Sequence, residues 1–197
     1  GNLYDLGEVT GLRLETLHVP ASYRSRFDFP RVGIAGTRRA IGVPQGALVG
    51  TIIKPNVGLF AEQIAELVGQ LCAAGVDFIK DDEVCANPDH APLAERVPAV
   101  MAVIREHAQR TGKKVMMAFN ISDDLDAMRR HADLVAEQEG TCVMASLNYC
   151  GFSAIESLRK STPLAIHGHR NGFGAISRHP LLGVAYQPYQ TMWRLAG

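Results

Sequence analysis

Short apolar runs alternate with longer helical patterns five times from about residue 49 onward. The runs predict strands over residues 47–54, 76–80, 113–120, 141–148 and 163–169. Such a series of βα units specifies a parallel sheet, which is either doubly wound or part of a βα barrel. A doubly wound nucleotide site needs a glycine-rich turn after its first strand, whereas residues 54–60 read KPNVGLF. The pattern therefore favours a barrel.

Helices are predicted between these strands, at residues 61–75, around 100–112, from Ser122 onward, over 152–160 and over 181–196. Ser122 is expected to cap the third helix, with Asp123 and Asp124 in its first turn. Five βα units cannot close a barrel, which needs eight. The first 48 residues show turn signals and one strand-like stretch. We therefore expect residues 1–48 to end a preceding domain and its linker, and residues 49–197 to form the first part of the barrel.

Composition argues against several classes of partner. The 197 residues include 20 basic and 20 acidic side chains, so the formal net charge is zero, and no basic run indicates nucleic acid. No stretch approaches the ~20 apolar residues of a membrane span, and no signal peptide is visible. The four cysteines form no CxxC pair and no zinc spacing, which indicates a reduced, cytoplasmic setting.

Polar side chains gather where the predicted strands end, and in βα barrels the carboxyl ends of the strands surround the active site. The sharpest group is Lys80, Asp82 and Glu83, because two neighbouring carboxylates supply hard oxygen ligands to Mg²⁺. Such a cation stabilises the enediolate that forms when a proton leaves a carbon beside a carbonyl. Lys80 can serve as a base with a lowered pKa, or be modified into an oxygen ligand. The alternative is a solvated run of charges in a loop, but the position at a strand end favours the site.

Each of the other strand ends offers two interpretations. Lys54 can act as a general acid or base, or extend to the barrel rim. Asn120 either orients a ligand or satisfies backbone groups. His167 and His169 are separated by one residue, and we expect one of them to face the barrel interior and the other the helices. Arg170 either clamps a phosphate oxygen or pairs with a nearby carboxylate.

Several motifs resemble those of one family. GTIIKPNVGL (50–59) and IKDDE (79–83) resemble the GTIIKPKLGL and KDDE segments of RuBisCO large subunits, at matching separation. MMAFNIS, the CGF at 150–152 and the HGHR at 167–170 follow in the family's order, so the resemblance covers essentially the whole chain. It implies a (β/α)8 TIM barrel of RuBisCO large-subunit type, with about five βα units present here. It also implies a homodimer or higher homo-oligomer, in which the N-terminal domain of one subunit completes the partner's site.

The resemblance also implies a role for each matching residue. Lys80 is similar to the lysine that CO₂ carbamylates, and Asp82 and Glu83 to its fellow Mg²⁺ ligands. Lys54 resembles the lysine that assists proton transfer, and His169 the histidine near the metal. Lys54, Lys80 and His169 are therefore the expected catalytic residues. The positions expected to contact a sugar-phosphate substrate are Asn120, His167 and Arg170.

Departures from the carboxylase pattern change the expected activity. Asn56 replaces the second lysine of KPK, Ala145 and Ser146 stand where carboxylases have histidine and aspartate, and a later histidine is replaced around Phe173. The sequence resembles instead the form IV RuBisCO-like proteins of the HGHRNG type. This implies an Mg²⁺-dependent lyase or isomerase that forms an enediolate from a phosphorylated keto-sugar or 3-oxo sugar acid, for example a 3-oxo-isoapionate 4-phosphate decarboxylase. The alternatives are true ribulose-bisphosphate carboxylation, a methionine-salvage enolase or isomerase, and a non-catalytic barrel subunit.

Overall fold

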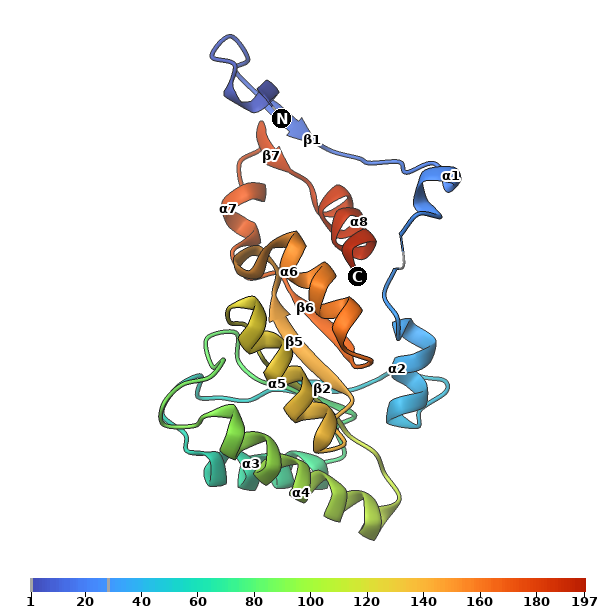
Figure 1. The fold of residues 1–197 in the computed structure, drawn as a ribbon, viewed down its shortest axis with the longest axis vertical. Helices are drawn as coiled ribbons and strands as arrows, with labels where there is room; N and C mark the ends of the chain where they lie inside the picture. The colour runs from blue at the N-terminus through green and yellow to red at the C-terminus, as the bar shows by residue number, and fades with distance from the viewer. Residues whose placement is uncertain (1, 28) are drawn as a thin grey trace.

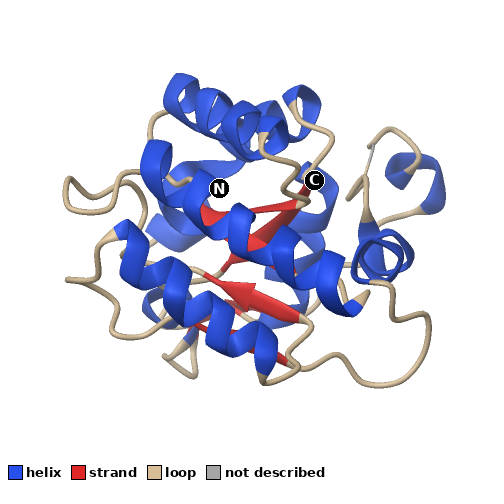
Figure 2. Cartoon of the chain, turned by 90° about the horizontal axis from the view of Figure 1, so that it is seen from below, coloured by secondary structure: helices blue, strands red, loops and turns tan. Residues whose placement is uncertain are grey.

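The computed structural model describes residues 2–27 and 29–197, and a five-stranded parallel sheet lies at its centre (Figure 1). The strands lie side by side in sequence order: β2 (Gly50–Ile52), β3 (Phe78–Lys80), β4 (Met116–Asn120), β5 (Cys142–Ser146) and β6 (Ala165–His169). The helices that follow the first four strands are α3 (Ala61–Ala73), α4 (Leu93–Thr111), α5 (Leu125–Glu137) and α6 (Leu147–Ser161). Figure 2 shows helices packed around the strands. The fold is the partial βα barrel that the sequence predicts.

The register of the sheet brings the carboxyl ends of its strands to one edge. Ile52 lies opposite Lys80, and Ser146 lies opposite His169. Because every pair of neighbours is parallel, the residues that follow these strands gather at the same end of the sheet. This edge is where the sequence places its polar side chains.

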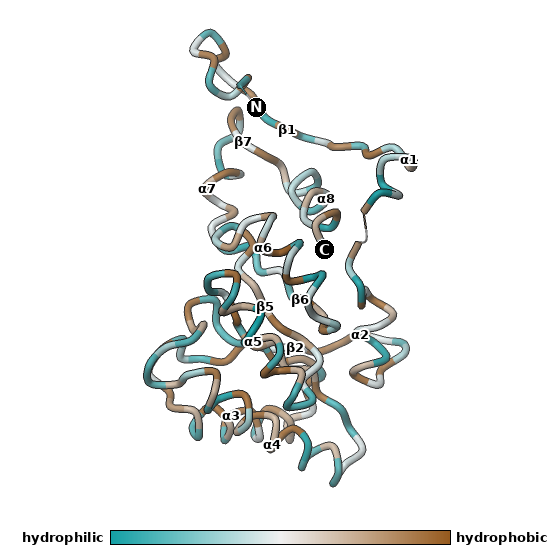
Figure 3. The backbone as a smooth tube through the Cα atoms, viewed as in Figure 1, coloured by the Kyte–Doolittle hydropathy of each residue, from teal (hydrophilic) through white to brown (hydrophobic). Residues whose placement is uncertain are grey.

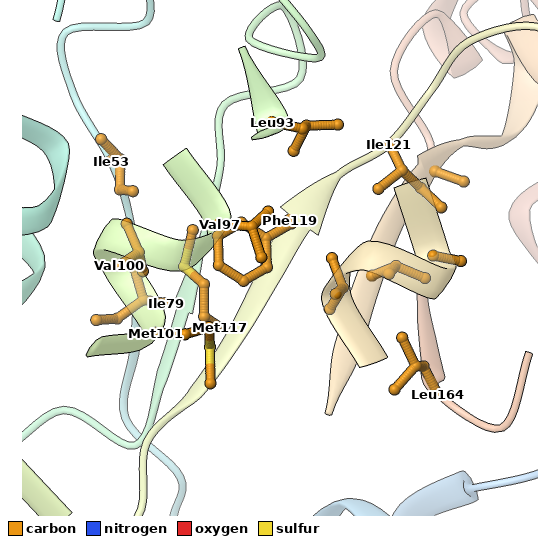
Figure 4. Packing of buried hydrophobic residues seen from close by; sticks show 14 of the residues in the cluster. Ile53, Ile79, Leu93, Val97, Val100, Met101, Met117, Phe119, Ile121 and Leu164 are labelled. Atoms are coloured by element: carbon orange, nitrogen blue, oxygen red, sulfur yellow. The ribbon is translucent and has the colours of Figure 1, made fainter. Parts of the chain in front are cut away.

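Alternate residues of β3, β4 and β5 enter two different cores. Ile79 and Phe119 are fully buried and face the helices, within the large cluster drawn in Figure 4. Burying a side chain of the size of Phe119 contributes about 1.5–3 kcal/mol. The alternate residues of these strands face the other side of the sheet. There Met116 of β4 and Met144 of β5 pack with Ile41 of α2 (Gly33–Ile41). We call this second side of the sheet the interior face.

The helices present one apolar side to these cores. Along the tube in Figure 3 the colour changes repeatedly between teal and brown within the helices, as expected where one side meets the core and the other meets water. α4 ends at Gly112, whose φ of 74° is the left-handed conformation that glycine adopts readily at a helix end. In the part of the chain that the structure describes, no helix is long and apolar enough to cross a membrane.

Helix α5 begins two residues later than predicted. Its cap is Asp124, whose carboxylate accepts a hydrogen bond from the Ala127 amide at 2.9 Å, so the expectation that Ser122 caps this helix is wrong. The Ser122 hydroxyl instead donates to Asn120 Oδ1 at 2.7 Å and accepts from the Ser146 amide at 2.8 Å. Ser122 therefore ties the turn after β4 to the end of β5.

The two ends of the chain pair with each other, which the local pattern does not reveal. The single helix predicted over 181–196 is in fact β7 (Leu182–Val184) followed by α8 (Tyr186–Ala196), after a short α7 (Phe173–Ser177). β7 pairs in parallel with β1 (Leu12–Leu14), and Figure 1 shows the blue and red strands side by side. Upstream of the barrel lie η1 (Asn2–Asp5) and α1 (Ala21–Arg24). Residues 182–184 become a strand because β1 supplies hydrogen-bonding partners from far away in the sequence.

Candidate active site at the strand ends

Three of the sequence-predicted site residues converge from two strands of the sheet. Lys80 is the last residue of β3, and its Nζ lies 3.8 Å from Glu83 Oε2. The same Glu83 oxygen lies 3.8 Å from Nε2 of His169, the last residue of β6. A carboxylate thus stands between an amine and an imidazole from strands that are not adjacent in the sheet.

The Lys80 amine sits in a mostly dry position. Its side chain is 15% exposed, and its Nζ donates to the Asp81 carbonyl at 2.9 Å and lies 3.9 Å from Met144 Sδ. Burial lowers the pKa of Lys80, although the charges of Glu83 and Asp82 act in the opposite direction. A larger fraction of Lys80 is therefore in the neutral, nucleophilic form than for a lysine in water.

Asp82 and Lys54 form an ion pair beside this group. The Asp82 side chain is 2% exposed, and its carboxylate also accepts from the Val84 amide at 3.0 Å. Burial raises the pKa of Asp82, but the hydrogen bonds from Lys54 and Val84 outweigh it and the pKa is lowered overall. The hydrogen bond to Asp82 in turn raises the pKa of Lys54. Lys54 is therefore an ammonium group in this arrangement, suited to stabilising negative charge.

The side chains at this edge supply part of the ligand set that Mg²⁺ requires. Among the described residues, no three or more His, Cys, Asp and Glu side chains are grouped so that they could hold a metal ion. Asp82 and Glu83 supply two carboxylates, which match the oxygen preference of Mg²⁺, and this ion ordinarily keeps several waters. A further protein oxygen would require modification of Lys80, whose Nζ is already beside Glu83. With that modification the residues fit a magnesium ion.

The two histidines of β6 share the interior face. The expectation that one of them faces the helices is wrong, because residues two apart on a strand lie on the same side. Their ring centroids are 6.3 Å apart, and the His167 ring also lies 5.4 Å from that of Phe78. Burial, and then the charges of Lys80 and His169, lower the pKa of His167 to about 4. His167 is therefore neutral at pH 7.

Arg170 follows β6 and lies against two aromatic rings. Its guanidinium carbon is 5.7 Å from the ring centroid of Phe173 and 5.8 Å from that of Tyr186. Cation–π contacts of this kind contribute about 0.5–1 kcal/mol each at exposed sites. Within residues 2–27 and 29–197, no carboxylate pairs with Arg170. The guanidinium is thus held in place by packing, which favours the interpretation that it binds an anion over pairing with a carboxylate of the chain.

Asn120 is fully buried and uses its whole side chain within the protein. Its Nδ2 donates to the carbonyls of Asp82 and Glu83, at 3.0 and 3.1 Å. Its Oδ1 accepts from the amide and the hydroxyl of Ser122, at 3.1 and 2.7 Å. Of the two roles that the sequence leaves open, this arrangement favours satisfying backbone groups.

Two buried residues next to this site were given no role by the sequence analysis. Asp81 and Arg96 form an ion pair of 3.2 Å, with side chains 2% and 0% exposed. A signal was present, because Arg96 falls near the N-terminus of α4, where the helix dipole disfavours a positive charge. An arginine in that position indicates an acidic partner nearby.

A pocket of about 440 Å³ lies along β6. It does not coincide with the group formed by Lys80, Asp82 and Glu83, which we call the Lys80 cluster. Residues from α2, α6, β6 and α8 line it, including Arg170 and Tyr186. Lys80, Asp82 and Glu83 are not among its lining residues. β6 is the last strand of the five-stranded sheet, and the pocket follows its far side. Cluster and pocket therefore approach each other only around the end of β6.

Comparison with known proteins agrees with this geometry. The family model for the ribulose bisphosphate carboxylase large chain, catalytic domain, matches residues 33–197. The chain belongs to the RuBisCO large-chain family. A RuBisCO-like protein from Burkholderia fungorum, whose crystal structure is known, is 66% identical with a TM-score of 0.98, and the match covers 100% of this chain and 49% of that one.

Curated relatives within the RuBisCO family bear more specific names. A "3-oxo-isoapionate-4-phosphate transcarboxylase/hydrolase" from Xanthobacter autotrophicus is 51% identical over 197 residues. A "3-oxo-isoapionate-4-phosphate decarboxylase" from Rhizobium etli is 46% identical over 198 residues. Each match covers 100% of this chain and 48% of the relative. The chain thus spans about half the length of the curated relatives it matches.

Proposed function

We propose that this chain carries the cation-binding and proton-transfer part of an Mg²⁺-dependent RuBisCO-like enzyme. Its substrate is a phosphorylated keto-sugar or 3-oxo sugar acid. The best candidate is 3-oxo-isoapionate 4-phosphate, because relatives matched along this whole chain are named for that compound. Loss of CO₂ from a β-keto acid and loss of a proton beside a carbonyl both give an enolate, so one cation site serves both reactions.

The observation that carries this proposal is the convergence of Lys80, Glu83 and His169 beside the Lys54–Asp82 pair. Apolar core residues such as Met144 border this edge, and apolar packing alone gives no reason to bury charged groups beside them. Clusters of charged groups with shifted pKa values are typical of functional sites.

Each residue has a distinct part in the proposed reaction. Asp82, Glu83 and a carbamate formed by CO₂ on Lys80 would hold Mg²⁺. When bound, Mg²⁺ supplies positive charge next to the oxygen that becomes negative in the enediolate. Lys54 begins as an ammonium group and would donate its proton to the carbon or oxygen that gains negative charge, which leaves a neutral amine. His169, whose Nε2 lies 3.8 Å from Glu83 Oε2, is the third proposed catalytic residue.

The phosphate end of the substrate is assigned to Arg170. A guanidinium binds two phosphate oxygens through parallel N–H groups, and packing against Phe173 and Tyr186 holds its plane before the substrate arrives. His167, which is neutral at pH 7, is assigned to hydrogen-bond a hydroxyl of the sugar. Asn120 contributes indirectly, by holding the backbone that bears the two carboxylates.

The end of β5 favours enolisation or decarboxylation over carboxylation. Ser146 is neutral and 3% exposed, while Ala145 belongs to the core that faces the helices. This strand end therefore supplies no acid or base, at the positions where the resemblance puts histidine and aspartate in carboxylases.

Isotope exchange tests the proposal in the whole protein with Mg²⁺ and bicarbonate. Ribulose 1,5-bisphosphate, methylthio-sugar phosphates and 3-oxo sugar-acid phosphates are each followed by NMR for deuterium exchange, CO₂ release and product. We expect turnover of 3-oxo-isoapionate 4-phosphate that is lost in Lys80→Ala. The matched control is Lys114→Ala, which removes an exposed lysine before β4 and should leave turnover unchanged.

Other outcomes favour the alternatives. Carboxylation of ribulose bisphosphate would identify a true RuBisCO, and isomerisation of a methylthio-sugar phosphate would identify a methionine-salvage enzyme. Equal Mg²⁺ affinity in wild type and Lys80→Ala, without turnover of any compound, would favour a non-catalytic barrel subunit.

The proposal extends to the arrangement of the whole protein. Residues 1–48 would connect an N-terminal domain to the barrel that begins at residue 49. We further propose a homodimer or higher homo-oligomer in the cytoplasm, as the family resemblance implies. Cys72, Cys85, Cys142 and Cys150 are free thiols, which is consistent with a reducing compartment.

A further inference from the structure

Arg96 is the largest of the fully buried side chains, and it sits beneath the loop that bears Asp82 and Glu83. It is the fourth residue of α4, and its side chain points back toward the segment that joins β3 to α4, residues 81–92. Burying an arginine is costly unless its donors are satisfied. Its partners therefore show what the charge is used for.

The guanidinium binds acceptors from both ends of that segment. Nη2 donates to the Ala86 carbonyl at 2.6 Å and to the Cys85 carbonyl at 3.4 Å, and Nη1 donates to the Ala91 carbonyl. Nη2 also pairs with Asp81 Oδ2 at 3.2 Å. Arg96 thus joins the first residue of the segment to its middle and its end. Lysine, with three donors on one nitrogen, cannot reproduce this planar set.

Asp81 also connects Arg96 to the neighbouring strand β4. The oxygen that pairs with Arg96 also accepts from the backbone amide of Asn120, at 2.9 Å. The Asn120 side chain then donates to the carbonyls of Asp82 and Glu83. The backbone that carries the two carboxylates is therefore fixed on both sides, through Asp81 and through Asn120.

We propose that Arg96, through its ion pair with Asp81, is a positioning residue for the two carboxylates of the cation site. This inference rests on the proposed function, because it concerns the same site. Arg96 contacts neither Asp82 nor Glu83 through their carboxylates. It acts by holding the loop in the one conformation in which both can bind the same ion, so its loss costs cation affinity more than it costs the fold of the sheet.

The test uses Arg96→Met and Arg96→Lys in the whole protein, titrated with Mg²⁺ in bicarbonate buffer by calorimetry. Loss of a residue that orients metal ligands typically weakens binding about 10- to 100-fold, and we expect both variants to fall in this range. The matched control is Arg105→Met on the same helix, where Arg105 donates to the Gln138 carbonyl at 2.9 Å, far from the loop. Its Mg²⁺ affinity should equal that of wild type.

Hydrogen exchange separates positioning from general damage. In the Arg96 variants the amides of residues 82–91 should exchange faster, while those of β4 and β5 should keep wild-type protection. Raising the Mg²⁺ concentration should restore the lost turnover of Arg96→Lys, because the defect lies in affinity. Arg96→Lys keeps the charge and most of the volume, so its result decides the matter if Arg96→Met does not fold.

The outcomes separate the two proposals. If wild type itself binds no Mg²⁺ with bicarbonate present, the proposed function is overturned and this inference with it. If wild type binds and Arg96→Lys binds equally well, only the positioning role of Arg96 is overturned. Weaker binding together with faster exchange confined to residues 82–91 supports it.

Discussion

Replacing Asn120 with Asp separates a supporting role from contact with the substrate. The two side chains have nearly the same shape, but the NH₂ group becomes an oxygen. In wild type that group donates to the carbonyls of Asp82 and Glu83 at 3.0 and 3.1 Å, in a position without solvent access. In the variant, a carboxylate oxygen faces a carbonyl oxygen at both places. The Asp82 carbonyl still accepts from the Cys85 amide at 3.1 Å, but the Glu83 carbonyl loses its side-chain donor.

The magnitude follows from which carbonyl loses its partner. The Asp82 carbonyl keeps the Cys85 amide, whereas the Glu83 carbonyl loses the Asn120 donor. A buried acceptor left without its partner costs about 1–3 kcal/mol, which is the expected loss in the free energy of unfolding. For a domain of this size, 1 kcal/mol corresponds to about 2–4 °C in the melting temperature. The loss should be smaller at pH 5 than at pH 8. The new carboxyl group is buried beside other acceptors, its folded-state pKa is raised, and protonation restores one donor.

Urea unfolding at both pH values measures this loss, with Asn87→Asp as the matched control. Asn87 accepts from the Leu93 amide at 2.8 Å through Oδ1, at the start of α4. A carboxylate makes the same bond there and is favoured by the helix dipole, so this control should stay within about 0.5 kcal/mol of wild type. If Asn120→Asp were as stable as wild type and raised only the KM for the sugar phosphate, the supporting role would be refuted and Asn120 would be a substrate ligand.

Three further predictions concern other parts of the chain. Lys54→Met should raise the affinity for Mg²⁺ in the absence of substrate, because no ammonium group then competes with the ion for Asp82. The same variant should lose turnover. Weaker Mg²⁺ binding than in wild type, measured by calorimetry, would contradict this competition. Stability should fall as the pH drops from 6.5 to about 4, because the lowered pKa of His167 keeps it neutral in the folded state while the unfolded chain takes up the proton. This loss reaches about 3 kcal/mol, and a His167→Gln variant should show a flatter urea profile; identical profiles would refute the assignment. Gly183→Ala should release β7 from β1, because the φ of residue 183 is 123° and a Cβ there would lie 2.0 Å from the Ile176 carbonyl oxygen. If the amides of both strands kept wild-type protection from hydrogen exchange in this variant, the prediction would be wrong.

The alternating βα pattern predicted the sheet and most of its helices because burial imposes a period on the sequence. Strands buried on both faces read as apolar runs, and residues 116–120 and 142–146 are buried throughout. The positions of the polar residues at the strand ends then followed from topology alone. The same reasoning also fixes which side a strand residue faces, and applied to His167 and His169 it requires the shared face that the structure has.

Other features depend on partners that lie far away in the sequence. β7 was predicted as helix because its partner β1 precedes the barrel, and no local pattern connects the two. From the sequence alone, Ser122 resembles a helix cap. In the structure its hydroxyl instead accepts a hydrogen bond from the Ser146 amide at 2.8 Å, a partner that lies on another strand. The pairing of Arg96 with Asp81 likewise requires the path of residues 82–91, which form neither helix nor strand.

The period of two also explains how one short segment serves both chemistry and support. Lys80 lies on the interior face with the histidines, while Asp81 points to the helix side and meets Arg96 of α4. Asp82 turns back toward the site and pairs with Lys54. In KDDE the first and third residues therefore lie on the side of the proposed site, while the second is anchored in the layer behind them. Asp81→Asn should for this reason resemble Arg96→Lys in Mg²⁺ affinity, although the carboxylate of Asp81 meets Arg96 and is not one of the groups that would hold the ion. If Asp81→Asn bound Mg²⁺ as tightly as wild type, the anchoring of Asp82 and Glu83 would have to come from Asn120 alone.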